Sequence, residues 1–522
     1  MGGGGGGVVI GAGGRGGGGG NSQPDAGNDR DATADVAADA IEEGSPGKRP
    51  FDWVGILGTG QSLAVGGGPA INMSTSQPFQ NLKLVDNGPD PKYPIDGSGK
   101  PQWAAVPLIE PIRIRGPGTG AGYTDGQYPN NIEGETPHSG MGNTLSSLWA
   151  SRGLGEYVTA HAEFGWSGHC LVDIDKQGGK RAYPASLNEA RVWMTLAAKA
   201  NKTFGYGGIT LTHGECDANN PNYGAGVYRL WQDYNADLKA ITGQEGDIPM
   251  FVSQQSTIPG AGGSAVQIWQ QGTLHPGQIV CTGPKYPYQY LRDNLHLPAP
   301  GYERLGQKYA EVFDLVVNRK IAWNPVQPNK ISRTGTTITL GFDVPNPPLV
   351  WDTHVSAPHQ QANTEWALGK GFEVTSAQGA KLRIASVAVQ GDGVVITLAQ
   401  DPGATKVTVA YAVTPDGGSA EGLRGQLRDS DDFVGFDVET LDSQMTQGSA
   451  IVTSSSPNGF IHRTGWDLVS GDGVPLDTIV LHQDSNTQVT LSTPWPGASG
   501  KVRLTYRHDE RNFCVHFVMS EP

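Results

Sequence analysis

Between residues 51 and 322, short apolar runs alternate with segments whose apolar residues recur at the spacing of one helix face. The apolar runs predict β-strands, and the segments between them predict helices. The strands are expected at 53–57, 157–162, 209–212, 248–253 and 278–281. Strands that alternate with helices are typical of a parallel sheet covered on both faces, and such sheets bind ligands at the carboxyl ends of their strands.

Three of the helical segments carry a clear sequence signal. One helix is expected to begin at Ser186, because Glu189 three residues later completes a capping box. A second covers the apolar positions of 227–241 and is expected to stop at Gly243. The apolar spacing of a third predicts a helix over 302–316, at the end of the α/β region.

Beyond Trp323 the pattern changes to short alternating runs separated by turn signals, which predicts an all-β region. The clearest candidate strands are 336–342, 381–389, 393–398 and 406–412. We expect a β-sandwich over 323–433, with its closing strand supplied by 511–522. A small β module is expected over 434–510, inserted before that closing strand.

Two segments depart from these patterns. Residues 1–50 are rich in Gly, Asp, Ala and Glu with almost no large apolar side chains, which predicts a disordered tether. The letters of a dinucleotide fingerprint occur at 8–16, but more glycine follows where that fingerprint needs a helix, so no nucleotide site is expected. Residues 68–142 form a long stretch rich in Pro, Gly and Asn, and such a stretch is expected to wall a substrate cleft.

Composition and charge narrow the class of function. A chain of 522 residues is too long for one ordinary core and predicts two to four domains. The net charge of −14 and the absence of a basic stripe disfavour a nucleic-acid partner, because clustered Lys and Arg bind phosphate backbones. No apolar run approaches the roughly 18 residues of a membrane helix, so no transmembrane segment is expected. The four cysteines, at 170, 216, 281 and 514, show no metal-ligand spacing and leave zero to two disulfides open.

A serine and a distant Asp-x-x-His supply the parts of a Ser-His-Asp hydrolase. Ser62 follows the first strand behind Gly58 and Gly60, which permit a sharp turn that presents the hydroxyl at the edge of the sheet. His296, just before the last helix, would take the proton of that hydroxyl, and Asp293 would orient the imidazole. Each residue alone is an ordinary turn or loop residue, whereas their positions at the two ends of one α/β unit point to catalysis.

Acyl transfer also needs N–H donors for the oxyanion. The amide of Ser62 is one candidate, and Gly168, in the glycine block after the strand at 157–162, is another. The alternative is that this glycine block only forms a turn. After the strand at 209–212, either His213 or Glu215 is expected to line the pocket. The complete expected set is Ser62, Asp293 and His296 for catalysis, Ser62, Gly168 and His213 for the oxyanion, and Gln61, Glu215 and Trp166 for the substrate pocket.

The spacing of His213 and Glu215 also suggests two metal alternatives. Zinc deaminases combine His-x-Glu with a Pro-Cys-x-x-Cys segment, and this chain has none. His213, Glu215 and Asp217 could ligate a divalent ion by themselves, but three ligand types within one loop are a weak signal. No metal and no cofactor are therefore expected.

These blocks resemble the SGNH/GDSL hydrolase superfamily, and within it the carbohydrate esterases that include sialate O-acetylesterases and acetylxylan esterases. The segment 60–63 is similar to the first block of that group, Gly-Gln-Ser-Asn; 213–217 is similar to its third, Gln-Gly-Glu-x-Asp; and 293–296 is similar to its last, Asp-x-x-His. The likeness covers about 51–322.

The resemblance implies a three-layer, flavodoxin-like parallel sheet of the SGNH type, with Ser62 as nucleophile, His296 as base, Asp293 as its orienting group and Gly168 as an oxyanion donor. Two positions depart from the family blocks. Leu63 replaces the usual Asn, and at 213 a His replaces a Gln that can donate to the oxyanion.

Together these features predict a serine esterase that removes small acyl groups, acetyl foremost, from a poly- or oligosaccharide through an acyl-enzyme. The alternatives are a lipase, thioesterase or polyester-type hydrolase on the same fold, a glycan-binding protein with an inactive hydrolase domain, and, by analogy alone, a phage-type glycan deacetylase. An α/β-hydrolase is disfavoured, because Gly60-x-Ser62-x-Ala64 lacks the second glycine of a nucleophile elbow. Although no signal peptide is visible, a tether before an esterase domain suits a secreted or cell-surface protein.

Overall fold

A computed structural model describes most of the chain beyond the tether. The described residues are 47–68, 72–86, 103–113, 132–178, 182–260, 262–355, 357–358, 363–415, 424–436, 439–463, 465–508 and 510–522. The predicted tether, apart from 47–50, and the fingerprint letters at 8–16, where no nucleotide site is expected, therefore lie outside the described residues. In the part of the chain that is described, no helix has the length and apolar composition needed to cross a membrane.

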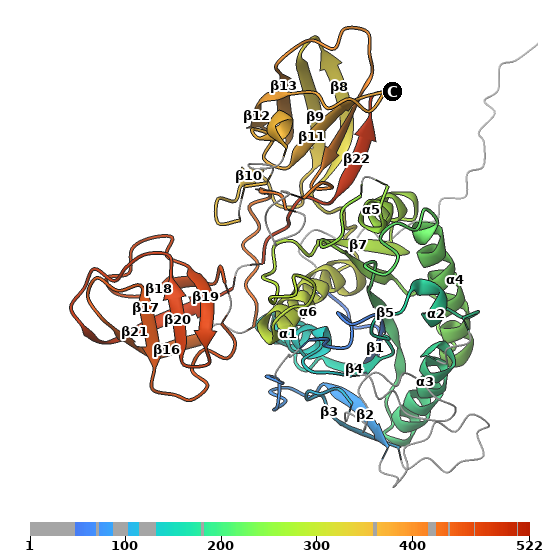
Figure 1. The fold of residues 1–522 in the computed structure, drawn as a ribbon. Coiled ribbons are helices and arrows are strands. Elements are labelled where there is room, and N and C mark those ends of the chain that lie inside the picture. Colours follow the sequence, from blue (N-terminus) through green and yellow to red (C-terminus); the bar gives the residue numbers. More distant parts are fainter. Residues whose placement is uncertain are drawn as a thin grey trace, which may run out of the picture. The chain divides into compact units, whose positions relative to one another are not determined.

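A seven-stranded sheet forms the centre of the α/β region, in the order β3-β2-β4-β1-β5-β6-β7 (Figure 1). Its strands are β1 (Trp53–Gly60), β2 (Leu82–Asp86), β3 (Trp103–Pro107), β4 (Val158–Glu163), β5 (Phe204–Thr212), β6 (Met250–Gln254) and β7 (Ile279–Pro284). All neighbours pair in parallel except β2 and β3. The five strands predicted from the apolar runs are confirmed as β1, β4, β5, β6 and β7. Taken alone, these five strands have the order 2-1-3-4-5 that flavodoxin-like sheets share.

Helices cover both faces of this sheet (Figure 1). They are α1 (Pro137–Ser151), α2 (Leu171–Ile174), α3 (Ala182–Lys199), α4 (Tyr223–Thr242), α5 (Ser264–Leu274) and α6 (Ala299–Phe313). Successive side chains of a strand point to opposite faces. Val54 and Ile56 of β1 therefore pack in the buried cluster with α1 and α6, while Leu57 packs in the cluster with α3 and α4.

Two of the three helix predictions are confirmed. The helix α4 ends at Gly243, which has the left-handed φ of 73° that favours glycine, and α6 continues into a π-helical turn at Asp314–Asn318. The predicted start at Ser186 is wrong, because the chain is already helical at Ala182. The Ser186 hydroxyl donates to the carbonyl of Tyr183 within the helix at 2.6 Å, so it caps no helix end.

The long stretch at 68–142 contains regular structure. Both β2 and β3 lie within it and extend the sheet beyond β4, and α1 begins at Pro137. The short alternation in this stretch was hidden by the surrounding Pro, Gly and Asn. The expectation that it walls a substrate cleft stays a prediction, since much of it lies outside the described residues.

The region after 323 is all-β, as predicted, and its strands pair antiparallel. Four strands form the order β12-β13-β9-β8, three form β11-β14-β22, and β10 pairs with β15. Their bounds are β8 (Gln327–Thr334), β9 (Thr337–Asp343), β10 (Val350–Trp351), β11 (Phe372–Ser376), β12 (Ile384–Gln390), β13 (Gly393–Leu398), β14 (Val407–Tyr411), β15 (Leu427–Arg428) and β22 (Phe517–Ser520).

A six-stranded sheet, in the order β18-β21-β16-β17-β20-β19, has a buried cluster of its own. Its strands are β16 (Glu439–Met445), β17 (Ile451–Ser454), β18 (Leu468–Ser470), β19 (Val480–Ser485), β20 (Gln488–Leu491) and β21 (Gly500–Arg507). An α/β region followed by β modules is therefore confirmed. The domain boundaries stay predictions.

Glu373 of β11 predicts a pH dependence of stability. Its buried carboxyl group accepts hydrogen bonds from the N–H groups of Val413 and Thr414 and from the Thr414 hydroxyl. Burial raises the pKa of Glu373 from 4.5 to about 7, against these hydrogen bonds. Because the folded state binds this proton more tightly than the unfolded state, its contribution is complete below pH 4.5 and is lost as the pH rises through about 7.

We expect Glu373→Gln to remove that loss, which amounts to about 3 kcal/mol. Denaturant unfolding of the wild type and the variant, followed by fluorescence between pH 4.5 and 8, measures it. A stability difference that stays constant across this range would contradict the prediction.

Candidate active site

The turn that carries Ser62 begins where β1 ends. Gly60 has a φ of 145°, and a Cβ at this position would lie 2.1 Å from the carbonyl oxygen of Thr212. The N–H of Gln61 donates to the same carbonyl at 3.1 Å, which ties the turn to the end of β5. Only glycine fits such a close approach, and the result is a Ser62 that is 7% exposed at the carboxyl end of β1.

Gly58 has a different role from the one expected. It lies inside β1 and pairs with the strands on both sides, so it does not form the turn. A Cβ on Gly58 would lie 2.1 Å from Glu163 Oε2 and 2.2 Å from His138 Nε2. Glycine is needed there because a buried polar pair occupies the space.

Asp293 and His296 form a pair on the loop that leads into α6. His296 Nδ1 lies 2.6 Å from Asp293 Oδ2, and Asp293 Oδ1 accepts the N–H groups of Leu295 and His296 at 3.0 Å each. Burial works against ionisation of Asp293, but the hydrogen bonds from the backbone and ring of His296 and from the Leu295 N–H outweigh it and lower the pKa of Asp293. The carboxylate is therefore charged at neutral pH and directs His296 Nδ1 toward itself.

Ser62 and His296 meet at Gly67. A Cβ on Gly67 would lie 2.7 Å from Ser62 Cβ and 3.1 Å from His296 Cδ2. The N–H of Gly67 donates to the Ser62 carbonyl at 2.7 Å, and the Tyr302 hydroxyl donates to the Gly67 carbonyl at 2.5 Å. Among the described residues, neither Ser62 Oγ nor His296 Nε2 has a hydrogen-bond partner. Catalytic hydrogen bonds of ligand-free enzymes are often formed only once substrate binds.

Two of the expected oxyanion donors have unused N–H groups. Within the described part of the chain, the amides of Ser62 and Gly168 have no hydrogen-bond partner. Gly168 is exposed, has a φ of 74°, and has no neighbour within 4 Å of the position of a Cβ. Both amides are therefore free to donate hydrogen bonds to an anionic ligand, and their role as oxyanion donors stays a prediction.

The ring of His213 is not placed as an oxyanion donor. It is completely buried, with Nε2 3.1 Å from the His169 carbonyl and Nδ1 3.3 Å from Tyr223 Oη. Burial lowers the pKa of His213, so the ring is neutral and carries one N–H. That N–H donates from Nε2 to the carbonyl, while Nδ1 accepts from Tyr223. The geometry thus gives no support to the predicted donor role, because both nitrogens are occupied.

The three expected pocket residues, Gln61, Glu215 and Trp166, all contact other described residues. Gln61 Oε1 accepts the N–H of Cys216 at 3.2 Å, so this side chain joins two loops. Glu215 is 5% exposed and lies 2.8 Å from Nζ of Lys285, which is completely buried. Trp166 is half-buried, and its ring stacks on His169 with centroids 3.7 Å apart. Sequence reasoning missed Lys285, because a single lysine after a strand carries no signal of its partner.

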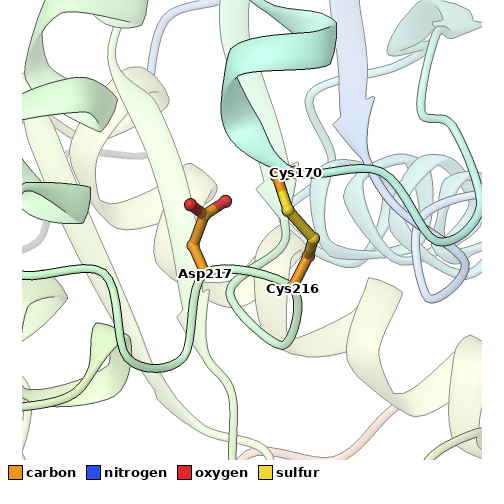
Figure 2. A group of neighbouring side chains, drawn as sticks. All are labelled: Cys170, Cys216 and Asp217. Carbon is orange, nitrogen blue, oxygen red and sulfur yellow. A yellow bond between two sulfur atoms is a disulfide. The ribbon is translucent and has the colours of Figure 1, made fainter.

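A disulfide joins the loops that follow β4 and β5. Cys170 and Cys216 are bonded, with Cα atoms 5.0 Å apart, and Figure 2 shows Asp217 beside them. The ligand atoms of these three residues lie within 4.8 Å of one another, as in a metal site. Both sulfurs are used in the bond, however, and the Asp217 carboxylate accepts the N–H of Leu171 at 2.7 Å and the amide of Asn220 at 2.8 Å. The group therefore acts as a loop clamp, since metal ligation by cysteine needs the thiolate.

The chain is similar to several solved structures, which include carbohydrate acetylesterases. No protein-family profile matches the chain, and no curated protein matches it. Similar solved structures include XAC1771, a carbohydrate acetylesterase from Xanthomonas citri, at 14% identity over 72% of this chain and 77% of that chain, with a TM-score of 0.42. A protein from Arabidopsis thaliana is 16% identical over 51% of this chain and 98% of its own, with a TM-score of 0.33. Est24, a carbohydrate acetylesterase from Sinorhizobium meliloti, is 12% identical over 50% and 99%, with a TM-score of 0.27.

The disulfide predicts a measurable loss of stability when it is removed. It closes a loop of 46 residues, and chain entropy assigns about 4 kcal/mol to a loop of that length. We expect Cys170→Ser to lower the free energy of unfolding by an amount of this order, as measured by urea denaturation without reductant. Cys281→Ala is the control, since it removes a buried free thiol without opening a loop and should cost about 1 kcal/mol. Equal losses in the two variants would contradict the assignment.

Proposed function

We propose that the protein is a serine esterase on an SGNH-type α/β domain, and that it hydrolyses short acyl esters, acetyl foremost, on a carbohydrate. The observation that carries the proposal is the Asp293–His296 pair, whose ring lies beside Ser62 at the carboxyl edge of the sheet. A nucleophile, a base and a group that orients the base are the minimum set for acyl transfer by serine.

In the first half-reaction, Ser62 Oγ attacks the acyl carbonyl while its proton passes to His296 Nε2. Asp293 accepts from Nδ1 and stabilises the imidazolium that forms. The negative charge on the carbonyl oxygen is stabilised by the N–H groups of Ser62 and Gly168. The tetrahedral intermediate collapses when the sugar oxygen leaves with the proton from His296, and the acyl group stays on Ser62.

In the second half-reaction, His296 takes a proton from water as the water oxygen attacks the acyl carbon. The ester bond to Ser62 breaks, its oxygen regains a proton from His296, and the carboxylic acid is released. The cycle consumes one water and needs no electron transfer. The two acyl-transfer steps thus use the same three side chains and the same two amides.

The disulfide supports the proposed location outside the cytosol. Disulfides persist in oxidising compartments and are rare where thiols are kept reduced. The Cys170–Cys216 bond lies between two loops of the proposed site, so the site as described is its oxidised form. A secreted or surface-attached esterase is consistent with that chemistry.

Loss of the Ser62 hydroxyl tests the reaction directly. We expect Ser62→Ala to reduce turnover of p-nitrophenyl acetate at least about 10³-fold and to abolish labelling by a fluorophosphonate, and Asp293→Asn to reduce turnover about 10⁴-fold. Ser151→Ala is the matched control, because its exposed hydroxyl donates only to the Leu148 carbonyl at the end of α1. Wild-type turnover in Ser62→Ala would disprove the mechanism.

The acyl and sugar classes need a separate comparison. We expect acetyl esters to be hydrolysed faster than butyryl and octanoyl esters, and acetate to be released from at least one of acetylated xylan, acetylated sialic acid and acetylated pectin. Faster turnover of long acyl chains would contradict the proposed carbohydrate esterase and would indicate a lipid-type hydrolase. Glycan binding without Ser62-dependent turnover would instead identify a binding protein.

A further inference from the structure

A chain of buried hydrogen bonds runs beneath the proposed site and ends on the glycine block after β4. The side chains in it are Asn81, Thr159, His161, His138 and Glu163, and the last group is the backbone N–H of Gly165. All five side chains are buried. The reaction proposed above uses none of them, so their presence needs another explanation.

The hydrogen positions in this series of hydrogen bonds follow from the contacts of Asn81, Thr159 and His161. The Thr159 hydroxyl donates to Asn81 Oδ1 at 2.7 Å, so its oxygen accepts from His161 Nε2, also at 2.7 Å. Burial, together with the neighbouring His138, lowers the pKa of His161 well below its usual range, so this ring is neutral. With its one hydrogen on Nε2, His161 can only accept at Nδ1.

His138 must therefore carry the hydrogen between the two rings. His138 Nδ1 lies 2.8 Å from His161 Nδ1 and donates to it. On its other side, His138 Nε2 lies within hydrogen-bond distance of Glu163 Oε2, at 2.9 Å. Glu163 Oε1 accepts the N–H of Gly165. The carboxyl group of Glu163 is thus held by α1 on one side and holds the glycine block on the other.

This contact sets the direction of the backbone at Gly165. The N–H groups before and after it, those of Phe164 and Trp166, donate at 2.9 Å to Gly58 and Gly60 of β1. The N–H of Gly165 points to Glu163, two residues earlier. The turn that contains Gly168 begins directly afterwards, at Trp166, and is closed by the N–H of His169 at 3.2 Å.

We propose that Glu163, held in place by His138, is a positioning residue that fixes the glycine block and thereby the N–H of Gly168 relative to Ser62. The inference rests on the proposed function, because it takes Gly168 as an oxyanion donor. The essential group is the oxygen that faces Gly165. A negative charge at position 163 is not essential, since a neutral acceptor at that atom would hold the same backbone.

Two substitutions at Glu163 separate these contributions. Glu163→Gln keeps an oxygen for Gly165, and its amide N–H can donate to His138 Nε2, so every hydrogen bond of the chain is retained. Glu163→Leu keeps the volume and removes the acceptor. We expect kcat for p-nitrophenyl acetate to fall about 10²-fold in Glu163→Leu with KM within about twofold, and to stay within about threefold of the wild type in Glu163→Gln.

Loss of the partner on α1 gives a second test. His138→Phe leaves Glu163 Oε2 without its hydrogen bond, and we expect its kcat to fall at least about tenfold with KM unchanged. The control is Glu189→Leu, which removes a completely buried carboxylate of α3 that lies 2.5 Å from Arg113. We expect that variant to have a lower Tm and the kcat of the wild type, so a general loss of stability is distinguished from loss of position.

Hydrogen exchange gives a readout that does not need activity. Exchange of the peptide 163–169, followed by mass spectrometry, should be as slow in Glu163→Gln as in the wild type and faster in Glu163→Leu. The inference is overturned if Glu163→Leu keeps the wild-type kcat, if Glu163→Gln loses as much kcat as Glu163→Leu, or if exchange does not change. If the wild type has no Ser62-dependent turnover, the proposed function fails, and the exchange result alone decides whether Glu163 positions the block.

Discussion

Gly58 and Gly60, near the end of β1, leave no room for a side chain, and the geometry of the site depends on that constraint. The Glu163–His138 pair occupies the space above Gly58, and the Thr212 carbonyl lies against Gly60. A side chain at Gly58 would displace the Glu163–His138 pair, and one at Gly60 would push β1 away from the backbone of β5. The position of the Ser62 turn above the sheet is therefore fixed by a backbone contact at Gly60 and by a buried side-chain pair at Gly58.

Cross-connections between loops extend this rigidity outward from β1. Gln61 bonds to the loop after β5, the disulfide joins that loop to the one after β4, and the ion pair of Glu215 with Lys285 connects it to the start of the segment that carries His296. Parallel sheets bring the carboxyl ends of their strands together, but loops of separate βα units have no intrinsic reason to keep a common register. In this protein, polar and covalent links between neighbouring loops hold those loops in fixed positions relative to one another.

The sequence predicted the parts of the molecule that depend on local pattern. Apolar runs located five strands of the sheet, Gly243 marked a helix end, and the blocks at Ser62 and His296 identified side chains that the fold brings together. The capping box at Ser186 failed, because a Ser and a Glu three residues apart also occur inside helices, where tertiary contacts use them differently.

Other features were not predictable, because they exist only between distant segments. His138 and Glu163 are 25 residues apart, and no local sequence pattern at either residue predicts their contact. The same holds for the disulfide, which the spacing of four cysteines left open, and for the contacts of the His213 ring with Tyr223 and the His169 carbonyl. Side-chain direction is decided by packing after the strands have assembled, so a motif match can place a residue near a site without aiming it there.

The pairing of β22 with β14 has a consequence for biosynthesis. Phe517 lies opposite Tyr411, and all strands of the six-stranded sheet are made between the two. During synthesis, one edge of β14 stays unpaired until residues 517–520 have emerged, while the six-stranded sheet can already close on its own cluster. The order in which the β modules mature is thus opposite to the order in which they begin in the chain, and a chain that lacks residues 517–520 would carry an exposed edge at β14.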